Sequence, residues 1–219
     1  MICSLLLLLC ACGVAAQQAP IPVDQEPHHH VILRNDSILV MHVTLQPGES
    51  TLYHTHSHDR VSVDLADNRL TRQLLNQPEG PPEDDKTGSV SSSTLGDGPY
   101  THRVKNLGAQ MFDVIDVEFL HRPAQSSTPA AAKVAAENPS GRVYQWKLAP
   151  GAASSMHTHQ RPYLILSATT MMLKMTAPDG QSSTHEVKAG DFHWIDSTVT
   201  HTLANAGTTE GQIVEIELK

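Results

Sequence analysis

Cysteine is absent from most of the chain. Of the 219 residues only three are cysteine, and all three lie within the first twelve positions. The segment 17–219 therefore contains no thiol, which excludes disulfide bonds and cysteine–metal coordination there. Concentrated positive charge is also missing, because 15 Lys and Arg stand against 23 Asp and Glu, with no basic cluster. This charge pattern excludes nucleic acid as a partner.

A hydrophobic run long enough to span a membrane is missing as well. The apolar run Leu5–Leu9 is too short for a transmembrane helix, so we expect no transmembrane span in the mature chain. Residues 1–16 carry no charged side chain and end in Val14-Ala15-Ala16, which fits a signal-peptide cleavage site. We therefore expect a signal peptide at 1–16 and a periplasmic or secreted protein that begins near Gln17. The alternative is a lipoprotein signal, in which Cys12 would be acylated and would anchor the chain.

Histidine, in contrast, is abundant, with 14 copies in the chain. It is the commonest metal ligand and titrates near neutral pH, so this excess needs an explanation. The run His28-His29-His30 precedes the first expected strand, and we interpret it as a flexible arm that binds metal only adventitiously. His58 follows a predicted turn and is a minor ligand candidate, and His193 is interpreted as a pocket wall or a surface residue.

The sequence contains an internal repeat that includes several of the other histidines. In the first copy, Leu45-Gln-Pro-Gly48 is followed after five residues by His54-Thr-His56. The second copy repeats this spacing with Leu148-Ala-Pro-Gly151 and His157-Thr-His159. Later in the copies the same spacing recurs in His102, Asn106 and Gly108 and in His201, Asn205 and Gly207. We expect the asparagines and glycines to form turns.

Each copy is predicted to consist of β-strands. Short runs with period-two alternation, such as Ile38–Leu45 and Tyr163–Leu166, are separated by Pro-Gly turn signals. Many short strands at regular spacing indicate a barrel or a sandwich. Residues 124–139 are rich in Ala, Ser and Pro and are predicted to be a linker with a short helical centre at 130–137. We therefore expect one domain at 17–123 and a second at 140–219.

The repeated motifs resemble the paired motifs of the cupin superfamily. The resemblance rests on Gly, five residues and His-x-His, followed by a Gly-Asp segment that leads to His, three residues and Asn. Gly190-Asp191 lies eleven residues before His201, whereas Gly88 lies fourteen residues before His102. The two copies together cover nearly all of the mature chain. The resemblance implies an all-β protein of two tandem, antiparallel, jelly-roll β-barrels preceded by a signal peptide.

The spacing of the motif histidines predicts a metal site in each barrel. Residues i and i+2 of a strand point to the same face, so both histidines of each His-x-His motif project inward together. A third imidazole from a later strand can complete the set. Such a set suits a divalent ion of Fe, Mn, Ni, Cu or Zn. The candidate ligands are His157, His159 and His201 in the second copy and His54, His56 and His102 in the first.

The chain departs from the resemblance at the usual glutamate position of the motif. Cupins usually have a glutamate after three further residues, where this chain has Arg60 and Tyr163. Beside a divalent cation Arg60 needs a neutralising anion such as Asp59 or Asp64, so the first site is either metal-free or binds an anionic ligand beside the metal. The second site is similar to the metal site of three-histidine dioxygenases. This similarity implies that Tyr163 of this chain donates a hydrogen bond next to the metal.

Two classes of function fit these residues. The first is a metal-dependent oxidoreductase of dioxygenase type that acts on a small organic substrate. The second is a non-catalytic module that holds a small molecule, an anion or a metal, with Arg60 and Arg103 as anion contacts. An isomerase or lyase is a third alternative, which is weakened because neither motif contains a carboxylate placed as a general base. A homodimer is also possible, since cupin barrels often pair through one face.

Overall fold

The computed structural model describes residues 19–96, 98–122 and 133–219. The expected signal peptide at 1–16, the acylation site Cys12 and most of the expected linker at 124–139 lie outside the described residues. Within these ranges no helix is both long and apolar enough to cross a membrane.

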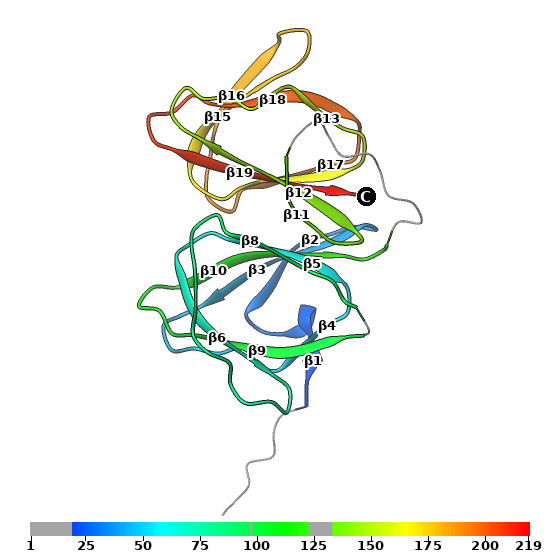
Figure 1. Cartoon of the computed structure of the whole chain (residues 1–219), viewed down its shortest axis with the longest axis vertical. Helices are drawn as coiled ribbons and strands as arrows, with labels where there is room; N and C mark the ends of the chain where they lie inside the picture. Colours follow the sequence, from blue (N-terminus) through cyan, green and yellow to red (C-terminus); the bar gives the residue numbers. More distant parts are fainter. Residues whose placement is uncertain (1–18, 97, 123–132) are drawn as a thin grey trace, which may run out of the picture.

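Two β-barrels follow one another along the chain (Figure 1). The first has the 3-10 turn η1 (Val23–Gln25) and the strands β1 (Ile21–Pro22), β2 (His29–Arg34), β3 (Ile38–Leu45), β4 (His54–His56), β5 (Asp59–Asp64), β6 (Asn68–Leu74), β7 (Glu83–Asp85), β8 (Val90–Ser93), β9 (Tyr100–Asn106) and β10 (Phe112–Phe119). The second has β11 (Val134–Glu137), β12 (Gly141–Leu148), β13 (His157–His159), β14 (Tyr163–Ser167), β15 (Met171–Thr176), β16 (Ser182–Val187), β17 (Phe192–Ile195), β18 (Val199–Asn205) and β19 (Gly211–Leu218).

Each barrel is built from two sheets. The first barrel pairs its strands in the orders β1-β4-β9-β6-β7 and β2-β3-β10-β5-β8, and the second in the orders β11-β12-β19-β14-β17 and β13-β18-β15-β16. The strands pair antiparallel throughout the described ranges, apart from the short parallel pair of β1 and β4. The all-β prediction with two sheet pairs is therefore confirmed, whereas the bounds 17–123 and 140–219 stay predictions.

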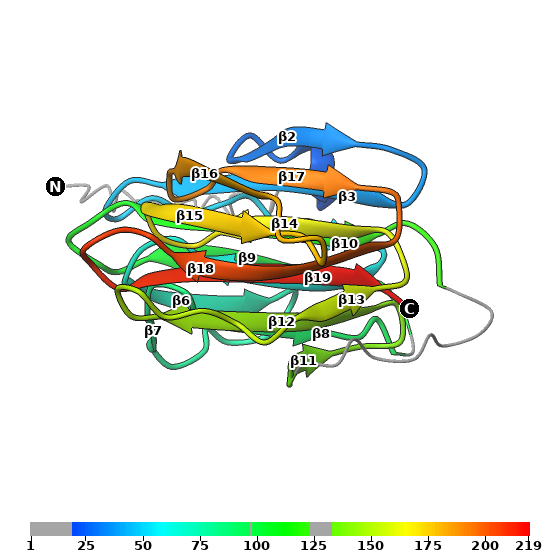
Figure 2. The same cartoon turned by 90° about the horizontal axis from the view of Figure 1, so that it is seen from above.

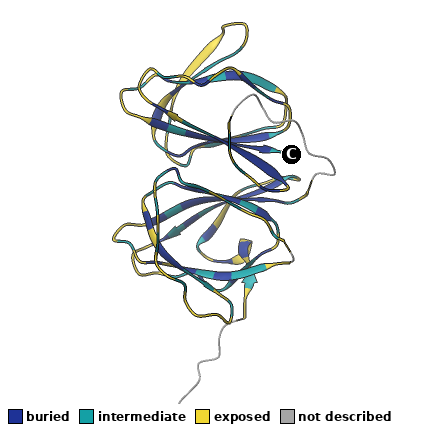
Figure 3. Ribbon diagram, in the orientation of Figure 1, coloured by how far each residue is buried: buried dark blue, intermediate teal, exposed yellow. Residues whose placement is uncertain are grey.

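The two barrels pack against each other through one sheet from each. Along β10, Ile115, Val117 and Phe119 point out of the first barrel and meet Val143 and Ile216 of the second in one buried cluster. The buried band between the barrels is visible in Figure 3. Figure 2 shows that the strands of both barrels lie roughly along one common axis. Because this face is apolar, the alternate residues of the same strands must point into the barrel interiors. Those interior positions carry the polar side chains of both sites.

One expectation about the segment between the copies is wrong. The helical centre expected at 130–137 is a strand where it is described, because β11 pairs with β12 and places Val134 opposite Tyr144. Pairing at the edge of the sheet therefore outweighs the helix propensity of the alanines in this segment.

The repeated asparagines form matching turns, as predicted. The amide of Asn205 donates to the carbonyls of Leu148 and Thr209, at 2.8 and 2.7 Å, and its Oδ1 accepts from the N–H of Gly207 at 2.9 Å. Asn106 makes the same set of bonds in the first barrel. Both side chains are buried. They tie the start of the last strand of each barrel to the strand that pairs with it.

We expect Asn205→Ala to lower the free energy of unfolding by about 3 kcal/mol, because it removes the bonds donated to the carbonyls of Leu148 and Thr209 and the acceptor of the Gly207 N–H. Asn205→Asp keeps the acceptor but loses both donated bonds, so its loss should be of similar size. Urea unfolding measures both values. A loss below about 1 kcal/mol for Asn205→Ala would show that these bonds do not hold the turn.

Candidate metal centre

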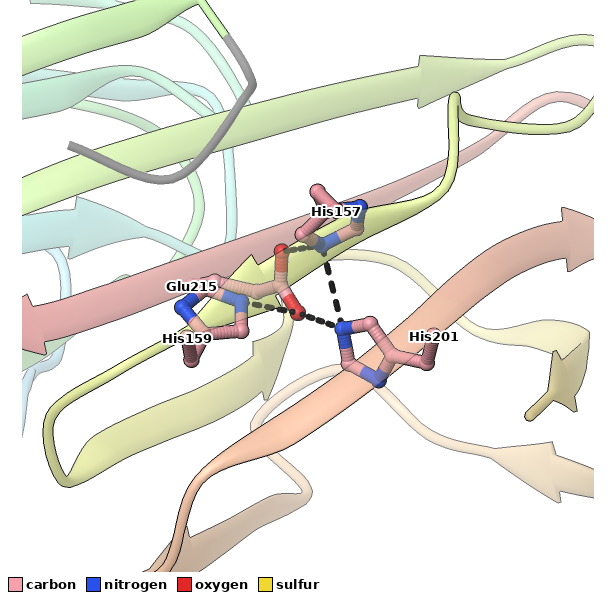
Figure 4. Close-up of side chains that lie close together, drawn as sticks. All are labelled: His157, His159, His201 and Glu215. Carbon is pink, nitrogen blue, oxygen red and sulfur yellow. Dashed lines mark hydrogen bonds and ion pairs between the residues drawn. The ribbon is translucent and has the colours of Figure 1, made fainter. Parts of the chain in front are cut away.

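Four side chains from three strands meet inside the second barrel (Figure 4). Strand β13 supplies His157 and His159 on one face, β18 supplies His201 directly opposite His157, and β19 supplies Glu215. Alternation along β13 sends both of its histidines inward. All four residues are buried, and none is more than 2 % exposed. The three histidines that the repeat predicted are therefore brought together, and a carboxylate joins them.

The ligand atoms of these four side chains face one another at short range. Nε2 of His157 lies 3.0 Å from Nε2 of His201 and 3.0 Å from Oε2 of Glu215. Oε1 of Glu215 lies 2.9 Å from Nε2 of His201 and 3.2 Å from Nε2 of His159. Two ligand atoms at right angles on a metal, each bonded at about 2.1 Å, are separated by about 3 Å. The spacing of this set is the spacing of a coordination shell.

Hydrogen bonding alone leaves this cluster poorly satisfied. Nδ1 of His157 donates to the carbonyl of Ser155 at 2.9 Å, so in the neutral ring Nε2 carries a lone pair that faces the cluster. Nε2 of His159 and Oε1 of Glu215 are buried and make no well-aligned hydrogen bond, although they lie 3.2 Å apart. Ligand atoms crowded together in this way favour a bound cation, either a proton or a metal ion. The donor set therefore fits a divalent metal ion.

Neighbouring side chains hold the four candidate ligands in place. The indole Nε1 of Trp146 donates to Oε2 of Glu215 at 2.7 Å, and the Tyr144 hydroxyl donates to Glu217 at 2.9 Å. Glu217 in turn lies 3.8 Å from Nδ1 of His159. Tyr163 stacks its ring on His159 at a centroid distance of 3.9 Å, while its hydroxyl has no hydrogen-bond partner in the described ranges. The contact of Tyr163 with the site is thus ring stacking.

The carboxylates make the second-barrel cluster hold a proton. Burial disfavours a charged imidazole, but Glu215 and Glu217 outweigh burial and raise the pKa of His159 to about 9. Burial also disfavours the charged form of Glu215, yet hydrogen bonds from the three histidines keep its pKa well below the usual value. Without a metal, the cluster is therefore a protonated imidazole beside a carboxylate.

Metal affinity of the second barrel should rise with pH up to about pH 9. Below that pH the free site keeps a proton on His159, and a metal must displace this proton to bind. The apparent affinity should therefore fall about tenfold for each unit that the pH drops below 9. Competition with a chromophoric chelator between pH 6 and 9 measures this slope, and an affinity that does not change with pH would contradict the assignment.

The first barrel also brings its three predicted histidines together. Nε2 of His56 lies 3.1 Å from Nε2 of His102, and the rings of His54 and His102 are 4.6 Å apart. His29 joins them, with its ring 4.4 Å from that of His54 and its Nδ1 2.6 Å from Glu26. The interpretation of residues 28–30 as a flexible arm is wrong for His29, because pairing of β2 with β3 carries this side chain into the barrel.

A guanidinium group already contacts the histidines of the first barrel. Nη1 of Arg60 lies 3.0 Å from Nε2 of His56 and 3.4 Å from Oδ2 of Asp116, and Asp116 also accepts from Ser62. Nδ1 of His56 pairs with Glu118 at 2.7 Å, so both ring nitrogens of His56 have partners. Burial and the positive charge of Arg60 hold the pKa of His56 well below its usual value. Because His56 has both nitrogens engaged and lies beside a guanidinium group, the set His54, His56 and His102 fits a metal less well than the second barrel does.

The partner of Arg60 differs from the expected Asp59 or Asp64. Asp59 points away from Arg60, because adjacent residues of a strand face opposite sides, and it binds Arg122 and Ser140 instead. Asp64 lies four residues farther along β5 and accepts from Asn68. The neutralising anion is Asp116, on the adjacent strand β10.

Other predicted residues lie apart from the two clusters or at their edges. Nε of Arg103 donates to Gln73, and its guanidinium lies over the ring of Tyr53, so the structure does not bring it to Arg60. His58 is half-buried and pairs with Glu118 at 3.0 Å. His193 lines a cavity of about 240 Å³ in the second barrel, with Ile165, Leu173 and Ile213 among its apolar walls.

Sequence reasoning missed Glu215. The motif places a carboxylate just after the second histidine, whereas here it comes from the last strand of the barrel. A signal was present in the repeat, since Glu215 and Glu217 alternate with apolar residues and align with Asp116 and Glu118. Carboxylates on the inward face of a buried strand are costly and require partners.

Comparison with known proteins gives relatives and structural neighbours of this chain. No protein-family profile matches the sequence. The "Beta-alanine degradation protein BauB" of Pseudomonas aeruginosa is 31% identical over 90 residues, which cover 41% of this chain and 94% of that protein. A cupin 2 conserved barrel domain protein from Leptotrichia buccalis matches with a TM-score of 0.52 and 13% identity over 86% of this chain and 87% of that one. Salicylate 1,2-dioxygenase from Pseudoaminobacter salicylatoxidans matches with a TM-score of 0.55 and 12% identity over 83% and 71%. At these identities the two solved structures show the fold alone.

Proposed function

The chain belongs to the cupin superfamily, and on that premise we propose that its second barrel is a metal-dependent oxidoreductase centre for a small organic molecule. The ligands are His157, His159, His201 and Glu215. The observation that carries this proposal is the spacing of about 3 Å between their facing atoms, two of which, Nε2 of His159 and Oε1 of Glu215, make no well-aligned hydrogen bond.

The donor set suits a divalent transition-metal ion. Three imidazoles and one carboxylate suit Fe, Mn, Ni, Cu or Zn. With four protein ligands, such an ion can keep open positions at which O₂ or a chelating substrate is activated. The carboxylate also removes one argument against an isomerase or lyase, but as a ligand held by Trp146 it is not free to act as a general base.

The residues around the cluster shape where a substrate would lie. Ile213 precedes Glu215 by two positions and therefore faces the same interior, and Ile165 lies opposite Glu215 on β14. Both line the cavity of about 240 Å³, whose largely apolar walls suit an apolar group. The relative named for β-alanine degradation and the dioxygenase named for salicylate both concern small organic compounds, which supports this substrate class.

Oxygen uptake by the reconstituted protein tests the proposal. Untagged protein loaded with Fe(II), Mn(II) or Cu(II) is mixed with a panel of small thiols, diketones, phenols and amino acids. Uptake should require the metal and should vanish in His157→Ala, while His30→Ala, which changes an exposed histidine, should keep it. Uptake that survives in His157→Ala would exclude the second barrel as the centre.

A non-catalytic metal-binding module is the second candidate. The observation that favours it is the complete burial of the four ligands, none of which is more than 2 % exposed. A substrate would reach such a centre only through movement of the barrel. One bound ion per second barrel with no turnover on any member of the panel would support this candidate over the oxidoreductase.

We also propose that the protein is exported to the periplasm or secreted. Support comes from residues 1–16, whose apolar run and small residues fit a signal peptide. Mass analysis of the protein from its native cells should give a chain that begins near Gln17. A lipid-modified Cys12 would show the lipoprotein alternative, and an intact Met1 would contradict export. A homodimer stays a prediction that light scattering tests.

A further inference from the structure

The two barrels differ at equivalent interior positions. Ser62 and Ile165 are equivalent because they lie opposite Asp116 and Glu215, the matching residues of the two last strands. Leu70 and Leu173 are equivalent because each pairs with the repeated asparagine. The second barrel has Tyr163, Ile165, Ser167, Met175 and Glu215 where the first has Arg60, Ser62, Asp64, Arg72 and Asp116. The first barrel thus has a charged interior where the second has a mostly apolar one.

This charged interior surrounds a cavity of about 660 Å³. That volume lies within the range of small-molecule sites, and Arg60, Asp64 and Arg72 are among the residues that line it. Hydroxyl groups of Ser91, Ser93 and Tyr100 contribute to the wall as well. His56 is among the lining residues, so the cavity borders the histidine cluster of this barrel.

Arg60 provides a fixed positive charge at the histidine end of the cavity. Its Nη1 contacts His56 and Asp116, while Nη2 and Nε have no hydrogen-bond acceptor among the described residues. The side chain is only 13% exposed, so these donors face the cavity rather than bulk water. In the second barrel the candidate metal would lie between the equivalent histidines and Glu215. The Arg60–Asp116 pair thus replaces a metal and its carboxylate.

Acidic side chains gather at the other end of the cavity. Asp64 lies four residues beyond Arg60 on the same face of β5, which places the two Cα atoms about 13 Å apart. One oxygen of Asp64 accepts from Asn68 at 2.6 Å, and Glu83 and Asp85 share the single cation Arg72. This end has more carboxylates than cations. Burial raises the pKa of Asp64 to about 7, so a positive group beside it would favour its charged form.

We propose that the first barrel binds, without a metal, a small zwitterion of the amino-acid type, with its carboxylate on Arg60 and its ammonium group on Asp64 and Asp85. Paired donors on a guanidinium suit a carboxylate, and carboxylates on the opposite wall suit an ammonium group. The carboxylates at the acidic end would repel the second carboxylate of a dianion, and Arg60 would repel the second ammonium group of a dication, so both should bind more weakly than a zwitterion. The proposal is independent of the metal centre in the second barrel.

Calorimetric titration with probes of matched length tests the charge pattern. The probes are 5-aminopentanoate, glutarate and 1,5-diaminopentane, together with shorter ω-amino acids from β-alanine upward. In the full chain an ω-amino acid should bind at least about tenfold more tightly than glutarate or the diamine. The His157→Ala variant should bind it equally well, which separates this site from the metal centre. Glutarate that binds as tightly as the amino acids, or no binding by any probe, would overturn the proposal.

Two substitutions identify the ends of the site. Asp64→Asn keeps the shape and should weaken amino-acid binding at least about tenfold without weakening glutarate. Arg60→Lys keeps the charge but removes the paired donors, so it should weaken both carboxylate probes. Melting curves confirm that both variants are folded. Unchanged amino-acid affinity in a folded Asp64→Asn variant would contradict the placement of the ammonium group.

Metal content tests whether Arg60 replaces a metal. The unaltered chain should bind about one divalent ion, and the double variant Arg60→Tyr/Asp116→Glu, which copies the second barrel, should bind about two. A metal ion in the first barrel of the unaltered chain, or an unchanged count in the folded double variant, would overturn this part of the proposal.

Discussion

Replacing Glu215 with glutamine should weaken the binding of a divalent ion to the second barrel by at least about a hundredfold. The substitution keeps the size of the side chain and an oxygen for the indole of Trp146, which donates to Glu215 at 2.7 Å. Among the described residues, this carboxylate is the only negative charge that contacts all three histidines of the centre, and the substitution removes it. The loss should therefore come from the charge and not from a change in packing.

Asp116→Asn is the matched control, since Asp116 occupies the equivalent position in the first barrel. Asp116 pairs with Arg60 and Ser62, so we expect this variant to keep the metal affinity of the unaltered chain. Titration with Mn(II) or Zn(II) against a competing chelator measures both variants. If Glu215→Gln binds as tightly as Asp116→Asn, then Glu215 is not a ligand.

Removal of the metal should lower the melting temperature of the chain by about 8–16 °C when the ion had been present at a thousand times its dissociation constant. A ligand that binds only the folded state at that excess stabilises it by about 4 kcal/mol. For a chain of this size each kcal/mol changes the melting temperature by about 2–4 °C. The four ligands come from the separate strands β13, β18 and β19, so only the folded chain assembles the complete site.

The His157→Ala variant provides the control for this measurement. Its melting temperature should not respond to added metal or to a chelator, because one ligand of the centre is missing. A metal-dependent rise of similar size in this variant would place the stabilising ion elsewhere on the chain.

The repeat predicted the histidine clusters because strand geometry is regular. Residues two apart on β13 must face the same side, and the repeated His, Asn and Gly motif identified His201 as the partner of His157. The same logic placed His54 and His56 in the first barrel. The fold class and these six imidazoles therefore follow from sequence pattern and a few elementary rules.

Contacts across the sheets were harder to predict. Glu215 and Asp116 come from strands that reach the clusters only after the barrel closes, and no local spacing connects them to the histidines. The segments around His29 and around β11 have no alternating pattern that marks them as strands. Each becomes a strand by pairing with a neighbour, β2 with β3 and β11 with β12. Long-range pairing of this kind overrides local propensity.

An anomalous difference map, recorded at the absorption edge of the metal that the purified protein contains, tests the metal centre directly. We expect one strong peak per chain, about 2.0–2.3 Å from Nε2 of His157, His159 and His201 and from a carboxylate oxygen of Glu215. No peak should lie beside Arg60 in the first barrel. Metal-replete crystals without a peak among these four side chains would show that the second barrel does not bind the metal.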